Sequence, residues 1–126
     1  MKRLILTLMT LMLVPCFALA SGATATIASI LDHLNHFPSD VDKAALTAIV
    51  NDAEATADEK TLAAIIARVA HRATDEDKAT LSVMLDNSET ASADRVIATT
   101  LMNLNHQVQA ADKKALQSLL RQGSAD

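Results

Sequence analysis

The sequence predicts an all-α fold of three stacked helix-turn-helix repeats of 35 residues, with six helices forming a short α-solenoid or a compact bundle. Three observations predict it. The chain repeats itself at a spacing of 35 residues. Within each repeat, apolar residues recur at the spacing of a helix face. No segment alternates polar and apolar residues for long enough to indicate a strand.

The repeat emerges when residues 26–60, 61–95 and 96–126 are aligned without gaps. Five positions are then identical in all three copies. They are Ala28, Ala63 and Ala98; His36, His71 and His106; Asp42, Asp77 and Asp112; Lys43, Lys78 and Lys113; and Leu46, Leu81 and Leu116. A spacing kept twice without an insertion indicates one structural unit used three times.

Each unit is expected to form two helices. In the first copy, one apolar face follows from Ile27, Ala28, Leu31 and Leu34, and a second from Leu46, Ile49 and Val50. The expected helices cover residues 24–36, 40–51, 58–71, 75–86, 93–107 and 110–122. Capping boxes are predicted at Ser39–Asp42, Thr56–Glu59 and Thr74–Asp77, and Pro38 ends the helix that precedes it.

A single hairpin cannot bury its apolar stripe, so neighbouring units are expected to share the core. The alanines at 28, 63 and 98 are expected where helices approach closely. A stack of three units would leave two apolar ends, so the chain could self-associate. The plan resembles the tandem α-hairpin class of TPR and HEAT repeats over residues 26 to about 122. That resemblance is generic: the Trp, Gly and Tyr positions of TPR units are not met, and no functional residue carries over.

Residues 1–20 are predicted to be a secretory signal peptide. Lys2 and Arg3 precede an apolar run over 4–14, and Ala18 and Ala20 place small residues where a signal peptidase cleaves. The mature domain would then be residues 21–126 in the periplasm or secreted. A lipoprotein anchored through Cys16 is the less favoured alternative. Without the leader no cysteine remains, and no membrane insertion is expected after cleavage.

Charge and composition exclude several partners. Removing Lys2 and Arg3 from the eleven basic residues leaves nine against fifteen acidic ones, a net charge of −6. Nucleic acid is therefore a poor partner, because its phosphates repel such a surface. Phe37 is the one remaining Phe, Tyr or Trp, which disfavours stacking platforms.

The histidines are the obvious candidates for metal binding. Equivalent side chains in a regular stack would lie about 10 Å apart, too far for His36, His71 and His106 to share one ion. We therefore expect these residues to cap helix C-termini and predict no metal site or cofactor. The weak alternative is the pair His33 and His36, three residues apart on a helix.

The acidic repeat positions have a structural interpretation. Asp42, Asp77 and Asp112 are expected in the first turns of helices, where the helix dipole favours acids. Lys43 and its copies would pair with acids of the adjacent unit. The run 75–77 lacks the glycine and the distant glutamate of a calcium-binding EF-hand loop.

No catalytic motif stands out, since Gly-x-Ser-x-Gly, His-Glu-x-x-His and a glycine-rich phosphate loop are all absent. The expected function is therefore a non-enzymatic protein–protein interaction module outside the cytoplasm. The alternative is a metal-binding or metal-buffering protein that uses His33, His36, His71 and His106. A third hypothesis, an inhibitor or immunity protein against an exported hydrolase, rests on the acidic charge alone.

Overall fold

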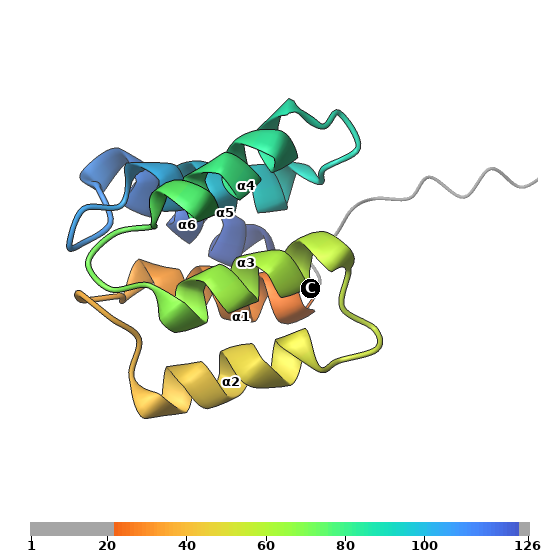
Figure 1. The fold of residues 1–126 in the computed structure, drawn as a ribbon, viewed down its shortest axis with the longest axis horizontal. Helices are drawn as coiled ribbons and strands as arrows, with labels where there is room; N and C mark the ends of the chain where they lie inside the picture. Colours follow the sequence, from red (N-terminus) through yellow and green to blue (C-terminus); the bar gives the residue numbers. More distant parts are fainter. Residues whose placement is uncertain (1–21, 124–126) are drawn as a thin grey trace, which may run out of the picture.

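The computed structural model describes residues 22–123, and this part of the chain is all-helical (Figure 1). It contains six helices and no strand, which confirms the predicted fold class. The helices are α1 (Gly22–Asp32), α2 (Asp40–Val50), α3 (Ala57–Arg68), α4 (Asp75–Asp86), α5 (Ser92–Asn103) and α6 (Ala110–Gly123). The signal-peptide prediction and Cys16 lie outside the described residues.

The 35-residue register of the sequence is the register of the helices. Thr26, Thr61 and Val96 are each the fifth residue of α1, α3 and α5. The second helices α2, α4 and α6 begin at 40, 75 and 110, again 35 residues apart. The predicted threefold repeat is therefore confirmed in the positions of the helices.

Capping residues explain where three of the helices begin. The side chains of Ser39, Thr56 and Thr74 each accept a hydrogen bond from the backbone N–H three residues later. The acid at that later position accepts in return from the backbone of the cap residue, so all three predicted capping boxes are present. Each box satisfies two backbone donors that the helix itself leaves unpaired.

The three repeats close into a ring. The first helices of the repeats, α1, α3 and α5, all pack on one another around a pseudo-threefold axis. Each second helix lies against the first helix of the next repeat: α2 packs on α3, α4 on α5, and α6 returns to α1. This arrangement is a closed bundle and not an open solenoid. Within the described residues α6 covers α1, so the first repeat packs on the third. Self-association stays a prediction.

The core lies around this axis. Ala28, Ala63 and Ala98 are fully buried, as expected for sites of close helix approach. Fully buried aliphatic residues surround them on the same three helices and on the second helices. They are Ile27, Leu62 and Ile97; Leu31, Ile66 and Leu101; and Leu46, Leu81 and Leu116. Every repeat contributes equivalent residues, so no repeat has a core of its own.

The first helix of each repeat ends earlier than predicted. α1, α3 and α5 were expected to reach His36, His71 and residue 107, but they end at Asp32, Arg68 and Asn103. The histidines therefore lie in the connections to α2, α4 and α6. Figure 1 shows these three connections together at the left edge of the molecule, while the links α2–α3 and α4–α5 lie at the opposite side.

Candidate metal centre

His36, His71 and His106 have an unusual backbone conformation. Their φ angles are 66°, 67° and 64°, and no other residue in the described range has a positive φ. In each case the N–H of the following residue donates to the carbonyl of the preceding one, over 2.8, 2.8 and 2.7 Å. A hydrogen bond between residues i and i+2 around a central residue with positive φ forms the rarer, strained kind of γ-turn.

This conformation is costly for a residue with a side chain. Backbone strain of this kind costs on the order of 1–3 kcal/mol per residue. Glycine adopts positive φ with no steric penalty, although histidine tolerates it better than most other residues. Three histidines at three strained positions make their imidazole side chains candidate functional groups.

The three turns are joined to one another by a cycle of backbone hydrogen bonds. The N–H of His71 donates to the carbonyl of His36 and that of His106 to the carbonyl of His71, both over 2.6 Å. The N–H of His36 donates to the carbonyl of His106 over 2.9 Å, which closes the cycle. Strained turns from all three repeats thus meet on the pseudo-threefold axis.

The imidazoles converge on one point. The Nδ1 atoms of His36 and His71 are 3.1 Å apart, those of His71 and His106 are 3.1 Å apart, and those of His106 and His36 are 3.3 Å apart. We call these three residues the histidine triad. The expected separation of about 10 Å is wrong, because the repeats surround an axis instead of following a line. The expected role as helix C-caps is also wrong, since the residues lie beyond the helix ends.

Hydrogen bonding within the triad cannot satisfy all three nitrogens. The Nδ1 atom of an imidazole carries either a proton or a lone pair in the ring plane, never both. In a closed cycle each nitrogen would have to donate and accept at the same in-plane position. Two of the three Nδ1 atoms must therefore be alike, so that two lone pairs or two protons point at each other. A cation at the centre removes this conflict because it accepts all three lone pairs at once.

The triad has the dimensions of a metal site. Zinc binds imidazole nitrogen at about 2.0–2.1 Å. At that bond length, nitrogens 3.1–3.3 Å apart subtend angles of about 100° at the ion, close to the tetrahedral value. His71 and His106 are exposed and His36 is half-buried. A metal ion could therefore reach the triad from solvent without local unfolding.

His33, the other member of the weak alternative pair, contacts a different partner. His33 turns its Nε2 to the carboxylate of Asp42, 3.3 Å away, and takes no part in the triad. Among the described residues, the one group of three or more His, Cys, Asp or Glu side chains with metal-ligand spacing is the histidine triad. Sequence reasoning missed this group because it assumed a linear stack.

The acids at 42, 77 and 112 stabilise the individual hairpins. Each contacts the residue nine positions earlier: Asp42 contacts His33, Asp77 contacts Arg68, and Asp112 accepts from the Asn103 amide. Their expected place in the first helical turn is confirmed. The expected lysine ion pairs are not: the two ion pairs found within the described residues use His33 and Arg68.

Hydrogen bonds decide the ionisation of two of these acids, Asp77 and Asp42. Burial raises the pKa of Asp77, but the hydrogen bond from the Arg68 guanidinium and the Thr74 cap outweigh it, so the pKa lies below its ordinary value. At Asp42 desolvation is the largest single effect and raises the pKa, but the hydrogen bonds from Ser39 and His33 together outweigh it, so the pKa is also lowered. Both carboxylates therefore stay ionised at neutral pH and hold their caps.

A second polar cluster occupies the other end of α1, α3 and α5. Thr24, Glu59 and Asp94 are repeat equivalents, each the third residue of its helix, and each is at least 95 % buried. The Thr24 hydroxyl donates to Glu59 Oε1 over 2.8 Å, whereas Asp94 Oδ1 is buried with no hydrogen-bond partner. Desolvation, followed by the charges of Glu59 and Asp58, raises the pKa of Asp94 to about 6.

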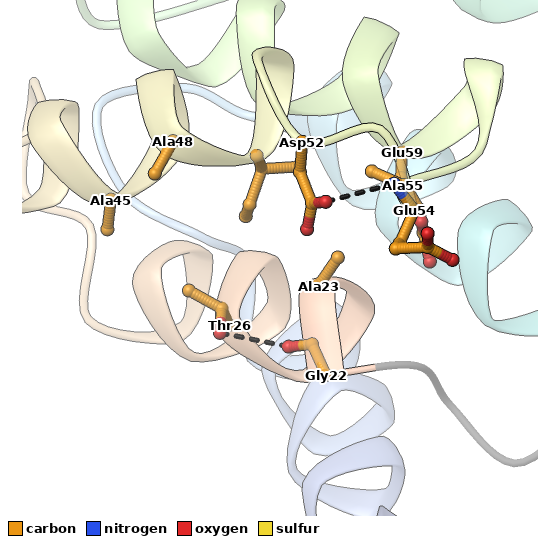
Figure 2. Close-up of a pocket in the computed structure, with 10 residues that line it drawn as sticks. Gly22, Ala23, Thr26, Ala45, Ala48, Asp52, Glu54, Ala55 and Glu59 are labelled. Atoms are coloured by element: carbon orange, nitrogen blue, oxygen red, sulfur yellow. Dashed lines mark hydrogen bonds between the residues drawn. The ribbon is translucent and has the colours of Figure 1, made fainter.

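A groove of about 480 Å³ lies between the start of α1 and the end of α2 (Figure 2). Its wall contains alanines and the acids Asp52, Glu54 and Glu59. Asp52 accepts from the backbone N–H of Glu54, and Glu59 accepts from the backbone N–H of Thr56. The carboxylates of Asp52 and Glu59 thus accept hydrogen bonds from nearby backbone N–H groups. The groove is therefore a weaker candidate site than the triad.

Comparison of the chain with protein-family models, curated proteins and solved structures found no match. The likeness to TPR and HEAT repeats therefore stays generic, and the closed ring differs from the open stacks of that class. No helix within residues 22–123 is both long and apolar enough to cross a membrane. The candidate function rests on the geometry of the triad.

Proposed function

We propose that the protein binds one divalent transition-metal ion through Nδ1 of His36, His71 and His106. The observation that carries the proposal is the mutual approach of three imidazole nitrogens to within 3.3 Å. Each nitrogen comes from a different repeat and is held in place by a strained turn. Strained backbone conformations cluster at ligand clamps, where the surrounding fold compensates for their cost.

The donor set favours zinc, or cobalt as its spectroscopic substitute. Imidazole suits Zn²⁺, Cu²⁺ and Ni²⁺, whereas Mg²⁺ and Ca²⁺ prefer oxygen ligands. Three equivalent nitrogens with angles of about 100° fit a tetrahedral ion and do not fit the square-planar arrangement that Cu²⁺ and Ni²⁺ favour. The ion would connect the first repeat to the third as well as to the second, so metal binding would stabilise the closed ring.

This proposal was the second hypothesis from the sequence, and the geometric reason for ranking it second does not hold. The proposed site uses the three histidines of the triad and does not include His33. The protein-interaction module, the absence of enzymatic activity and the inhibitor hypothesis all stay predictions. A metal site of this kind does not exclude a protein partner.

We also propose that the protein works outside the cytoplasm, in the periplasm or secreted. The support is the basic, apolar and small-residue pattern of residues 1–20. Expression of the full chain in a bacterial host with fractionation and N-terminal sequencing tests this. A product that begins at Ser21 in the periplasmic fraction is expected, and a cytoplasmic product that begins at Met1 would contradict it.

Calorimetry on chelator-treated protein tests the metal proposal. Zn²⁺ is titrated into the wild type, His71→Asn and His33→Asn. Asparagine is a suitable replacement at position 71 because it removes the imidazole and tolerates positive φ. His33→Asn is the matched control, since it also removes one imidazole, but from a histidine that contacts Asp42 and not the triad. Circular dichroism first confirms that all three chains are helical.

The expected result is one Zn²⁺ per chain in the wild type and in His33→Asn. His71→Asn should lose at least 100-fold in affinity, because two neutral imidazoles bind zinc far more weakly than three. Mg²⁺ should give no binding heat. If His71→Asn binds as well as the wild type, or if His33→Asn loses affinity instead, the triad is not the site.

A further inference from the structure

We propose that the metal ion held by the triad keeps a coordination position open to solvent and takes a small anion there as its fourth ligand. This inference rests on the proposed function. It adds that the site is a receptor for an exogenous ligand and not a closed structural centre. Structural zinc sites are closed by four protein ligands, whereas sites that bind or transform ligands have three protein donors and one exchangeable position.

The triad supplies three imidazole donors. Among the described residues, no carboxylate or thiolate joins the three imidazoles at metal-ligand spacing. The residues two positions before each histidine are buried aliphatic ones, Leu34, Val69 and Leu104. These three side chains carry no atom that binds a metal ion.

The geometry leaves the fourth direction along the axis. An ion about 2.05 Å from three nitrogens spaced 3.1–3.3 Å apart must lie about 0.9 Å outside their plane. The fourth tetrahedral position then points along the pseudo-threefold axis, away from the three nitrogens. His71 and His106 are exposed, so the triad is in contact with solvent, from which a ligand would arrive.

Charge decides the class of ligand. Imidazoles bind metal as neutral groups, so the triad leaves both positive charges of the ion uncompensated. Sites completed by thiolates or carboxylates neutralise that charge internally. Here an incoming anion would do so, and a bound water would be acidified for the same reason. The expected ligands are small monovalent anions with a nitrogen, sulfur or oxygen donor.

Cobalt spectroscopy of the full domain tests the inference separately from the proposed function. Co²⁺ reports its coordination through visible absorption bands, whose intensity separates tetrahedral from six-coordinate ions. Chelator-treated wild type is loaded with one equivalent of Co²⁺, and azide or thiocyanate is then titrated in. His33→Asn is loaded in parallel as the matched control, because His33 is the nearest histidine outside the triad in sequence.

A saturable change in the cobalt bands, with one anion per metal and the same response in His33→Asn, is the expected result. If cobalt binds with unit stoichiometry but the bands ignore both anions, the fourth position is filled by the protein and this inference is wrong, while the metal site stands. If only His33→Asn responds, His33 is the fourth ligand and the inference is equally wrong. If cobalt does not bind, the proposed function itself fails.

Discussion

Protonation of Asp94 should make this protein more stable in mild acid, opposite to the effect of the capping acids. Asp94 is 4 % exposed, it lies beside Glu59, and one of its oxygens has no hydrogen-bond partner. Its folded-state pKa of about 6 lies above the ordinary value of 3.8. The folded protein therefore holds this proton more tightly than the unfolded chain does.

The sign and size of the change in unfolding free energy with pH follow from the two pKa values of Asp94. Because the folded pKa is raised, the stabilisation is fully present below pH 3.8 and is lost as the pH rises through 6. A difference of about two pKa units corresponds to about 3 kcal/mol of unfolding free energy. The wild type should lose up to this amount between pH 4 and pH 7.5 through Asp94 alone.

Urea denaturation of metal-free protein at pH 4.5 and pH 7.5 measures the effect. Asp94→Asn removes the ionisation, and Asp94→Thr installs the residue that the first repeat has at the equivalent position, Thr24. Asp86→Asn, at an exposed site at the end of α4, is the control. Relative to the wild type, both Asp94 variants should gain about 2 kcal/mol more at pH 7.5 than at pH 4.5. An unchanged pH dependence in both variants would refute the reasoning.

Three further predictions concern the triad, a cap and the core. In metal-free buffer, His71→Gly should be as stable as the wild type or up to about 1 kcal/mol more stable, because glycine accepts positive φ. Zinc should not stabilise this variant, whereas zinc at 100 times its Kd should stabilise the wild type by about 2.7 kcal/mol. Thermal unfolding with zinc or with chelator measures both, and equal zinc responses would count against the triad. Ser39→Ala should cost about 1 kcal/mol in urea unfolding through loss of a capping box, and a cost near zero would show that the box does not stabilise α2. Ile66→Ala should cost about 2–5 kcal/mol because this side chain is fully buried between repeats; a cost below 1 kcal/mol would contradict the shared core.

The helices and their register could be predicted because they follow from local patterns. The 3.6-residue apolar period and the three capping boxes each act within one or two helical turns, and the spacing of 35 residues repeats them along the chain. They are sufficient to place α2 and α4 to within a residue. Ring closure could not be predicted this way, because the same repeat pattern is compatible with α6 facing solvent or packing on α1.

The triad was missed because its geometry depends on that closure. A linear stack separates equivalent residues, whereas a ring brings them together on its axis. One signal was present in the sequence: the same histidine recurs in three turns that contain no glycine. The polar cluster of Thr24, Glu59 and Asp94 was missed for a related reason. Position 24 precedes the repeat frame that begins at Thr26, and the three residues are not alike.

The central claim is that three imidazoles, one from each repeat, meet at a single point on the pseudo-threefold axis. X-ray absorption spectroscopy of the zinc-loaded protein tests this most directly, since imidazole rings produce characteristic multiple scattering. Three imidazoles per zinc at about 2.0–2.1 Å, reduced to two in His71→Asn, is the predicted result. A zinc ion with one imidazole or none, or a spectrum that His71→Asn leaves unchanged, would contradict it.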